Sequence, residues 1–186
     1  VLIKHIIGLL SPDKGSIVID GVDITTLDIR ELDRIRAKLG VLFQGGALFD
    51  SLTVHENVAF QLNEKTSLSK GEINDRVMQA LEDVGLKDMG KKNPAELSGG
   101  MKKRAALARA IAAEPKYIFY DEPTTGLDPI TSDMIMNLIS DMADKLKITS
   151  IIVTHDIKLA FTISTRIAML DKGNFVVTGT PEELRK

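Results

Sequence analysis

The sequence predicts an α/β fold with a mainly parallel sheet, an inserted α-helical subdomain and a small antiparallel β portion. Apolar runs that end in polar residues alternate with helical patterns, which is typical of parallel strands covered on both faces. Residues 53–113 show almost only helical patterns, so they are expected to form a helical subdomain inserted into the α/β body. We therefore expect a single domain over residues 1–186.

The first quarter of the sequence indicates two helices, a hairpin and one further strand. Residues 1–10, VLIKHIIGLL, are apolar nearly all round, as in a buried helix. Asp20 and Gly21 form a turn signal between alternating residues, which predicts a hairpin. The expected elements are a helix over 1–10, a hairpin over 16–24, a helix over 28–39 and a strand over 40–44.

Three helices are expected in the inserted subdomain. Thr53 with Glu56, and Ser69 with Glu72, match the Thr/Ser-x-x-Glu pattern in which two side chains cap the first backbone amides of a helix. A third helix is expected over 97–113. Its apolar face consists of Met101, Ala105, Ala108, Ile111 and Ala112.

The remaining chain predicts two more strands, three helices and a hairpin. KYIFYDEP and SIIVTHD are apolar runs that end in polar residues, and both predict buried strands. Thr180, Pro181 and Glu183 provide an N-cap, a first-turn proline and a capping glutamate for a last helix. The other expected elements are a helix along Ile135, Leu138, Ile139, Met142 and Leu146, a helix after residue 156, and a hairpin over 166–179.

Composition excludes several classes of function. The net charge is −2, so no broad basic face for nucleic acid dominates the chain. There is no cysteine, which excludes disulfides and cysteine-based metal or redox sites. No apolar run approaches the ~18 residues that span a bilayer. Lys4 and His5 interrupt the apolar start and no small-residue cleavage site follows, so we expect a soluble chain whose membrane role requires a partner.

Three of the expected strands end in polar residues that suggest chemistry. In an open parallel sheet, ligands bind outside the carboxyl ends of the strands, where Gln44, Asp121 with Glu122, and His155 are expected to converge. One of two adjacent carboxylates can hold a hydrated Mg²⁺ while the other orients or deprotonates a water. The alternatives are an acidic surface turn, which the buried run before Asp121 disfavours, and a structural histidine at His155.

Ser98, Gly99 and Gly100 stand at a helix start and form a candidate anion site. Free backbone amides, the helix dipole and a hydroxyl attract a phosphate, and the glycines let it approach. Taken alone, this pattern is more often a flexible cap. Basic residues of the same helix either support a phosphate or form a solvated face, and the solvated face is favoured for most of them. These residues are Lys102, Lys103, Arg104 and Arg109.

The motifs occur in one order over essentially the whole chain. They are LFQGGALFDSLTVHENVAF around Gln44, LSGGM from Leu97, YIFYDEP from Tyr117, GLDP from Gly126 and VTHD up to Asp156. Together they resemble the nucleotide-binding subunit of an ATP-binding-cassette (ABC) transporter. The resemblance implies the fold of a P-loop NTPase, with ATP and Mg²⁺ as ligands.

The resemblance implies a role for each polar strand end. Gln44 resembles the Q-loop glutamine, which touches Mg²⁺ and water and links the site to the transmembrane partner. Asp121 resembles the aspartate that supports Mg²⁺, and Glu122 resembles the catalytic carboxylate that polarises the attacking water. His155 resembles the switch histidine at the γ-phosphate.

The resemblance also implies a second copy of the chain. Ser98, Gly99 and Gly100 resemble the signature motif, which contacts the γ-phosphate held by the opposite subunit, and Asp128 resembles part of the D-loop at the dimer seam. GALFDSLTVHENVAF, LSGGMKKRAALARAIA and GLDPIT are further similar to the Mla-type ATPases of phospholipid or lipid-trafficking transporters in Gram-negative envelopes. The implied partners are a head-to-tail copy, a transmembrane permease and a periplasmic lipid-binding protein, which places the chain in the cytoplasm, peripheral on the inner membrane.

The family's phosphate-binding motif, G-x-x-x-x-G-K-[ST], is absent from the 186 residues. In the family this motif ends directly against a helix that resembles VLIKHIIGLL. We therefore expect a chain truncated at its N-terminus, with an exposed sheet edge and no ATP hydrolysis of its own. Two alternatives are an ABC ATPase of DNA repair or translation, which usually has long coiled coils or a second cassette, and a non-catalytic scaffold, against which Gln44, Glu122 and His155 argue.

Overall fold

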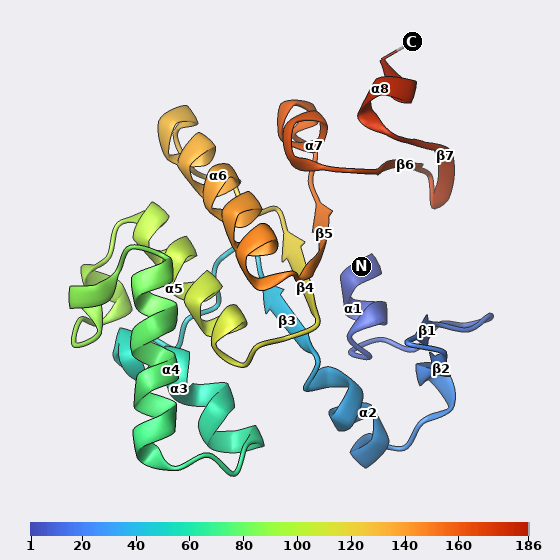
Figure 1. Cartoon of the computed structure of the whole chain (residues 1–186). Coiled ribbons are helices and arrows are strands. Elements are labelled where there is room, and N and C mark those ends of the chain that lie inside the picture. Colours follow the sequence, from blue (N-terminus) through green and yellow to red (C-terminus); the bar gives the residue numbers. More distant parts are fainter. Residues whose placement is uncertain (186) are drawn as a thin grey trace.

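A computed structural model describes residues 1–185 and shows a central sheet, two separate hairpins and eight α-helices within that range (Figure 1). The helices are α1 (Leu2–Ile6), α2 (Ile29–Arg36), α3 (Val54–Lys65), α4 (Lys70–Asp83), α5 (Gly99–Ala112), α6 (Pro129–Leu146), α7 (Ile157–Ile163) and α8 (Pro181–Leu184). The strands are β1 (Val18–Ile19), β2 (Val22–Asp23), β3 (Leu39–Leu42), β4 (Tyr117–Asp121), β5 (Thr149–Val153), β6 (Ile167–Asp171) and β7 (Asn174–Gly179). Within residues 1–185, no helix combines the length and the apolar character needed to cross a membrane.

The central sheet confirms the predicted α/β class and brings the strand ends together. β3, β4 and β5 pair in parallel in that order, with Leu42 opposite Tyr120 and Asp121 opposite Val153. The two hairpins, β1 with β2 and β6 with β7, are antiparallel as expected. Because the three central strands run in one direction, the residues that follow them lie at the same edge of the sheet.

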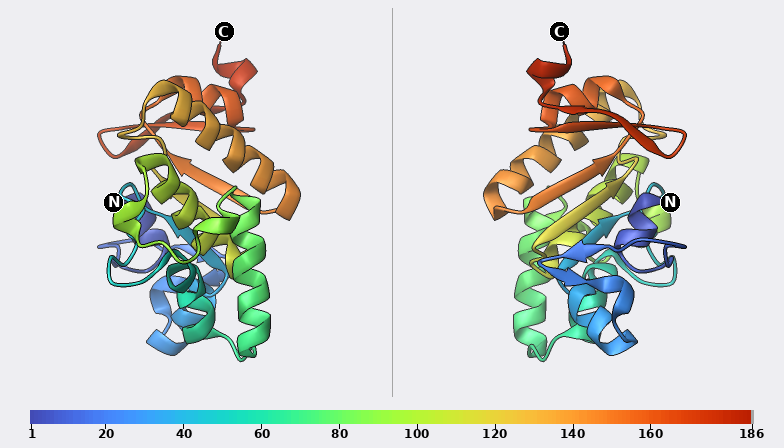
Figure 2. Two further views of the ribbon diagram at one scale, coloured as in Figure 1. Left: turned by 90° about the vertical axis from the view of Figure 1, so that its left-hand side faces the viewer. Right: turned by 90° about the vertical axis from the view of Figure 1, so that its right-hand side faces the viewer.

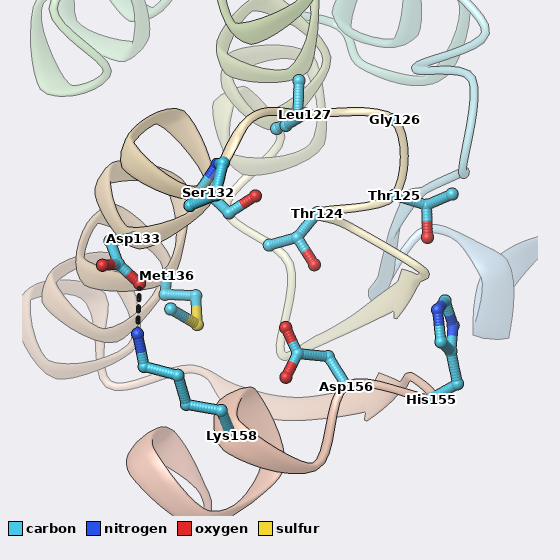
Figure 3. A pocket seen from close by; sticks show the side chains of 11 residues that line it. Thr124, Thr125, Gly126, Leu127, Ser132, Asp133, Met136, His155, Asp156 and Lys158 are labelled. Carbon is cyan, nitrogen blue, oxygen red and sulfur yellow. Dashed lines mark hydrogen bonds and ion pairs between the residues drawn. The ribbon is translucent and has the colours of Figure 1, made fainter.

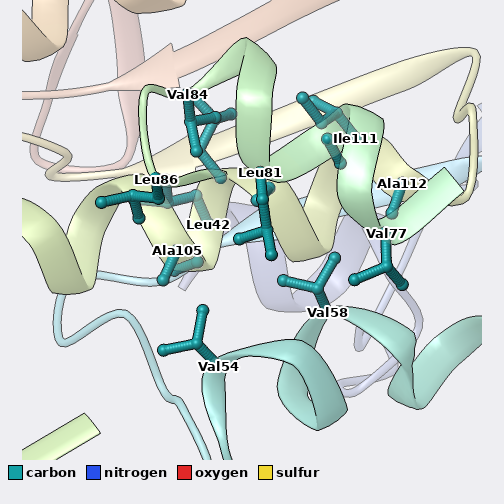
Figure 4. Close-up of a cluster of buried hydrophobic side chains, with 14 of the residues drawn as sticks. Leu42, Val54, Val58, Val77, Leu81, Val84, Leu86, Ala105, Ile111 and Ala112 are labelled. Atoms are coloured by element: carbon teal, nitrogen blue, oxygen red, sulfur yellow. The ribbon is translucent and has the colours of Figure 1, made fainter. Parts of the chain in front are cut away.

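Alternate residues of β4 anchor apolar cores on both faces of the sheet. Ile118 and Tyr120 pack with residues of α3 to α6, whereas Phe119 packs with Ile3 and Ile35 on the opposite face. The larger core joins α3, α4 and α5 to the sheet (Figure 4), and the two side views show helices on either side (Figure 2). Tyr120 and Phe119 are 0% and 2% exposed. Burial of one such side chain contributes about 1.5–3 kcal/mol.

Reciprocal hydrogen bonds start α3 and α4 where the sequence predicts them. The Thr53 N–H donates to the Glu56 carboxylate over 2.8 Å, and the Glu56 N–H donates to the Thr53 hydroxyl over 3.2 Å. Ser69 and Glu72 form the same pair of bonds over 2.7 and 3.3 Å. Each box satisfies two amides that a helix start leaves unpaired. The subdomain boundaries at residues 53 and 113 stay a prediction.

The first ten residues do not form the buried helix that their apolar pattern predicts. The helix is short, and of α1 and the residue after it only Ile3 and Ile7 are buried, whereas Leu2 is 43% exposed. Ile3 and Ile7 are four positions apart, so they lie on one face of the helical turn and only that face meets the protein. Gly8 then turns the chain with a left-handed φ of 71°.

β5 is also less buried than its apolar run predicts. Ile151 is 38% exposed, because β5 pairs only with β4 among the residues that the structure describes. The β6–β7 hairpin forms a separate sheet and exposes Leu170 and Phe175. A long apolar run predicts a strand correctly, but whether that strand is buried depends on neighbours that the run does not encode.

Candidate functional site

The polar residues that follow β4 and β5 meet at the carboxyl end of the sheet. Glu122 Oε2 lies 2.8 Å from His155 Nδ1, and Glu122 Oε1 accepts the backbone N–H of His155 over 3.1 Å. The Thr125 hydroxyl donates to the same carboxylate over 2.9 Å. The hydrogen bond and the charge of Glu122 hold the pKa of His155 above its usual value. The carboxylate is thus fixed in one orientation, while the imidazole is 79% exposed to solvent.

Glu122 makes this contact from a left-handed backbone conformation. Glu122 has a left-handed φ of 50°, which costs a residue with a side chain about 1–2 kcal/mol. Its N–H donates to the Val153 carbonyl over 2.9 Å, and its own carbonyl accepts the Thr125 N–H over 3.3 Å. A strained conformation persists where the surrounding structure fixes it, and strained residues of this kind cluster at functional sites.

An open pocket of about 360 Å³ lies beside the Glu122–His155 pair (Figure 3). The loop after β4, the start of α6 and the turn between β5 and α7 form its walls. The Thr124 hydroxyl and the Asp156 carboxylate face the pocket, and an ion pair of 3.1 Å between Lys158 and Asp133 closes one side (Figure 3). The pocket therefore offers polar groups of both charges next to an oriented carboxylate.

The backbone of Gln44 is linked to the Glu122–His155 pair through Lys103. Gln44 is exposed beyond the end of β3, and its carbonyl accepts a hydrogen bond from the Lys103 ammonium. The same ammonium donates to the Glu122 carbonyl over 3.4 Å. Asp121 is half-buried as the last residue of β4. The structure thus brings Glu122 and His155 into direct contact, whereas Lys103 connects them to Gln44.

The candidate anion site and Asp128 lie side by side. The Ser98 hydroxyl caps α5 by accepting a backbone N–H over 3.3 Å, and the Asp128 carboxylate caps α6 by accepting the Thr131 N–H over 3.0 Å. A methyl group added to Gly100 would come within 2.6 Å of Thr131 Cγ2. The two helix starts are therefore in contact, while Ser98 and Gly99 remain exposed.

Two of the four basic residues on α5 do not belong to a solvated face, so that expectation was wrong for them. Lys103 is 6% exposed, and the Arg109 guanidinium donates to two backbone carbonyls of the loop after β3. Burial lowers the pKa of both side chains. The sequence contains a signal for the burial of Lys103 but not for its contacts, because the apolar residues Ala106 and Leu107 follow three and four positions further on, on the same helix face.

The residues at the strand ends fit a magnesium ion that is shared with a phosphate. Across residues 1–185 there is no group of three or more His, Cys, Asp or Glu side chains that could hold a metal by itself. Mg²⁺ in proteins usually keeps several waters and takes one or two carboxylates together with substrate phosphates. Asp121 at the end of β4, together with Gln44 two residues after the neighbouring strand β3, offers the oxygen ligands of that smaller set.

Known proteins share both the sequence and the fold. The family model described as ABC transporter matches residues 1–125. The chain is 46% identical over 184 residues to the probable ribonucleotide transport ATP-binding protein mkl of Mycobacterium leprae, which covers 99% of this chain and 53% of that protein. It is 44% identical over 183 residues to the intermembrane phospholipid transport system ATP-binding protein MlaF of Haemophilus influenzae, which covers 98% of this chain and 69% of that protein.

A solved structure extends the likeness to three dimensions. The dimeric, post-hydrolysis ATP-binding cassette MJ0796 bound to ADP and Pi superposes with a TM-score of 0.86 at 33% identity. The match covers 97% of this chain and 79% of that one. The chain spans about half the length of the mkl relative, at 53%.

Proposed function

The chain belongs to the ABC transporter family, and we propose on that premise that it binds and hydrolyses ATP to drive lipid transport by a membrane partner. The observation that carries the proposal is the Glu122 carboxylate, which His155 and Thr125 hold beside an open pocket at the end of β4. A carboxylate fixed in this way can accept a proton from a water and orient it for attack.

Each residue at the strand ends has a separate role in the proposed ATP hydrolysis. Mg²⁺ bound with ATP neutralises charge on the phosphates. Asp121 and Gln44 would hold that ion, and Glu122 would orient the attacking water. The bond to Glu122 raises the pKa of the exposed His155 imidazole, which in its protonated form would offer its second N–H to a phosphate oxygen.

Two copies of the chain, arranged head to tail, would complete each ATP site. Ser98 and Gly99 are exposed at the start of α5, a helix of 14 residues whose free amides attract anions. Their contact with the segment that contains Asp128 gives one continuous surface for the second copy. The dimeric MJ0796 cassette with ADP and Pi supports this arrangement.

The proposed substrate class is a phospholipid or related lipid, because MlaF is the ATP-binding protein of an intermembrane phospholipid transport system. The permease would hold the chain at the cytoplasmic side of the inner membrane, and a periplasmic lipid-binding protein would be a further partner. The mkl relative is named for ribonucleotide transport. Stimulation of ATPase activity by phospholipid but not by ribonucleotides, in the complex with the permease, would favour the lipid.

The 186 residues by themselves are proposed not to turn over ATP. They contain no G-x-x-x-x-G-K-[ST] segment, whose lysine and backbone amides cradle the β- and γ-phosphates. Removal of one pre-organised donor to a developing charge costs about 3 kcal/mol, and this segment supplies several. Normal turnover by the isolated 186-residue chain would contradict this part of the proposal.

The dimer is tested by Ser98→Arg in the whole gene product that contains these residues. A bulky charge at the start of α5 should keep the ATP-bound copies apart, so the variant should stay monomeric with a non-hydrolysable ATP analogue during size-exclusion chromatography. Ser69→Arg is the matched control, because Ser69 caps α4 by the same kind of bond. ATP-dependent dimers of Ser98→Arg would refute the role of Ser98.

A further inference from the structure

Lys103 is a buried lysine whose ammonium lies between two backbone carbonyls of the site. Its Nζ donates to the carbonyl of Gln44, at the end of β3, and to the carbonyl of Glu122, at the end of β4. Lys103 itself belongs to α5, five residues after Ser98. One side chain therefore touches the two neighbouring strand ends and extends from the helix that begins with the candidate anion site.

The position is unusual for a lysine. Burial of an ammonium is costly unless nearby groups compensate its charge, and the carboxylates of Asp121 and Glu122 provide part of that compensation. Burial nevertheless lowers the pKa of Lys103. A methionine would fill the same space at no electrostatic cost. The bonds to the two carbonyls are therefore the feature that a lysine adds at this place.

Arg109 offers an internal comparison on the same helix. Its guanidinium donates to the carbonyls of Gly46 and Ala47 over 2.9 and 2.7 Å. Arg109 thus holds the loop after Gln44, as Lys103 does, but it makes no bond to the Glu122 turn. The two basic residues differ in whether they also bond the backbone of the Glu122 turn.

We propose that Lys103 is a positioning residue that ties the Gln44 loop and the Glu122 turn to α5, so that these parts of the site hold one geometry. The inference rests on the proposed function for its catalytic consequence, but its structural part stands without it. Glu122 keeps a left-handed backbone in which its carbonyl accepts the Thr125 N–H. When the bond from Lys103 is lost, both the loop and this turn should open more often.

Amide hydrogen exchange on the whole gene product tests the structural part. The Gly46 N–H donates to the Phe43 carbonyl over 2.8 Å and reports on the loop, and the Thr125 N–H reports on the Glu122 turn. Lys103→Met should speed exchange at both amides at least tenfold. Arg109→Met should speed exchange at Gly46 alone, and Lys102→Met, one position from Lys103, at neither.

Unchanged exchange at Thr125 in Lys103→Met would overturn the proposal. Should that variant not fold, Lys103→Gln carries the test, because its shorter amide cannot reach both carbonyls. Faster exchange at one or both amides is then expected, and wild-type exchange at both overturns the proposal.

Steady-state kinetics of the whole gene product test the catalytic part. Lys103→Met should lower kcat at least tenfold while KM for ATP stays within twofold, because Lys103 orients Glu122 and does not hold nucleotide. Lys103→Arg, which keeps two donors, should restore kcat. Equal loss in the Met and Arg variants, or a change in KM alone, would overturn the positioning role. If the unmodified gene product has no ATPase activity, the proposed function fails, while the exchange result still decides the structural link.

Discussion

The contact between the starts of α5 and α6 makes Gly100 a position where a single methyl group should matter. A methyl at Gly100 would lie 2.6 Å from Thr131 Cγ2, well inside normal carbon contact. Thr131 is β-branched, so its methyl cannot rotate away freely. Overpacking of this kind costs about 1–3 kcal/mol, and alanine regains about 0.5–1 kcal/mol of that through its better helix propensity. We therefore expect Gly100→Ala to lower the free energy of unfolding by about 1–2 kcal/mol.

Denaturant unfolding of the chain measures this loss, and two further variants isolate its cause. Gly99→Ala is the matched control, because its added methyl would lie 3.4 Å from Leu127 Cδ2, an ordinary contact. Thr131→Ser removes the methyl but keeps the hydroxyl that donates to Asp128. The double variant with Gly100→Ala should regain most of the lost stability. Equal stability of the Gly99 and Gly100 variants, or no rescue by Thr131→Ser, would refute the assigned contact.

Two predictions concern pH. Burial raises the pKa of Tyr120 to about 12, so the folded state keeps the phenol proton more tightly than the unfolded chain. Stability that is present below pH ~10 is therefore lost as the pH rises toward ~12, by roughly 3 kcal/mol in total. Unfolding at pH 9 and 11.5 should show this loss in the native chain and a smaller loss in Tyr120→Phe, and equal losses in the two would contradict the prediction. Glu122 raises the pKa of His155, so the ion pair between them weakens as the pH rises through the pKa of His155. NMR titration should show that the His155 pKa falls in Glu122→Gln. An unchanged pKa would exclude the pair in solution.

Local signals in the sequence located most elements of the fold. The capping pairs Thr53–Glu56 and Ser69–Glu72 placed two helix starts, because the bonds that define such a start lie within four residues. Asp20-Gly21 placed the first hairpin for the same reason. Asp28 and Glu31 form a capping box of the same kind at the start of α2, and their spacing in the sequence would have predicted it as well.

Burial was harder to predict, because it depends on distant partners. Residues 1–10 are apolar nearly all round, yet only the face with Ile3 and Ile7 is buried. β5 is a strand as predicted, but Ile151 is exposed at the edge of the sheet. The role of Lys103 was hidden because its two carbonyl partners are 59 and 19 positions away, and a helix rich in basic residues usually faces solvent. Contacts of this kind become visible only in the folded chain.

The central claim, that Glu122 is the catalytic carboxylate of an ATPase, is tested most directly by Glu122→Gln in the whole gene product. Phosphate release from ATP should fall at least ~100-fold, as expected when a general base is removed, while ATP affinity stays near that of the native protein. Glu114→Gln is the matched control, because Glu114 has the same left-handed φ of 50° but is exposed and precedes β4, at the opposite end of the strand from Glu122. Turnover by Glu122→Gln within tenfold of the native rate would contradict the account.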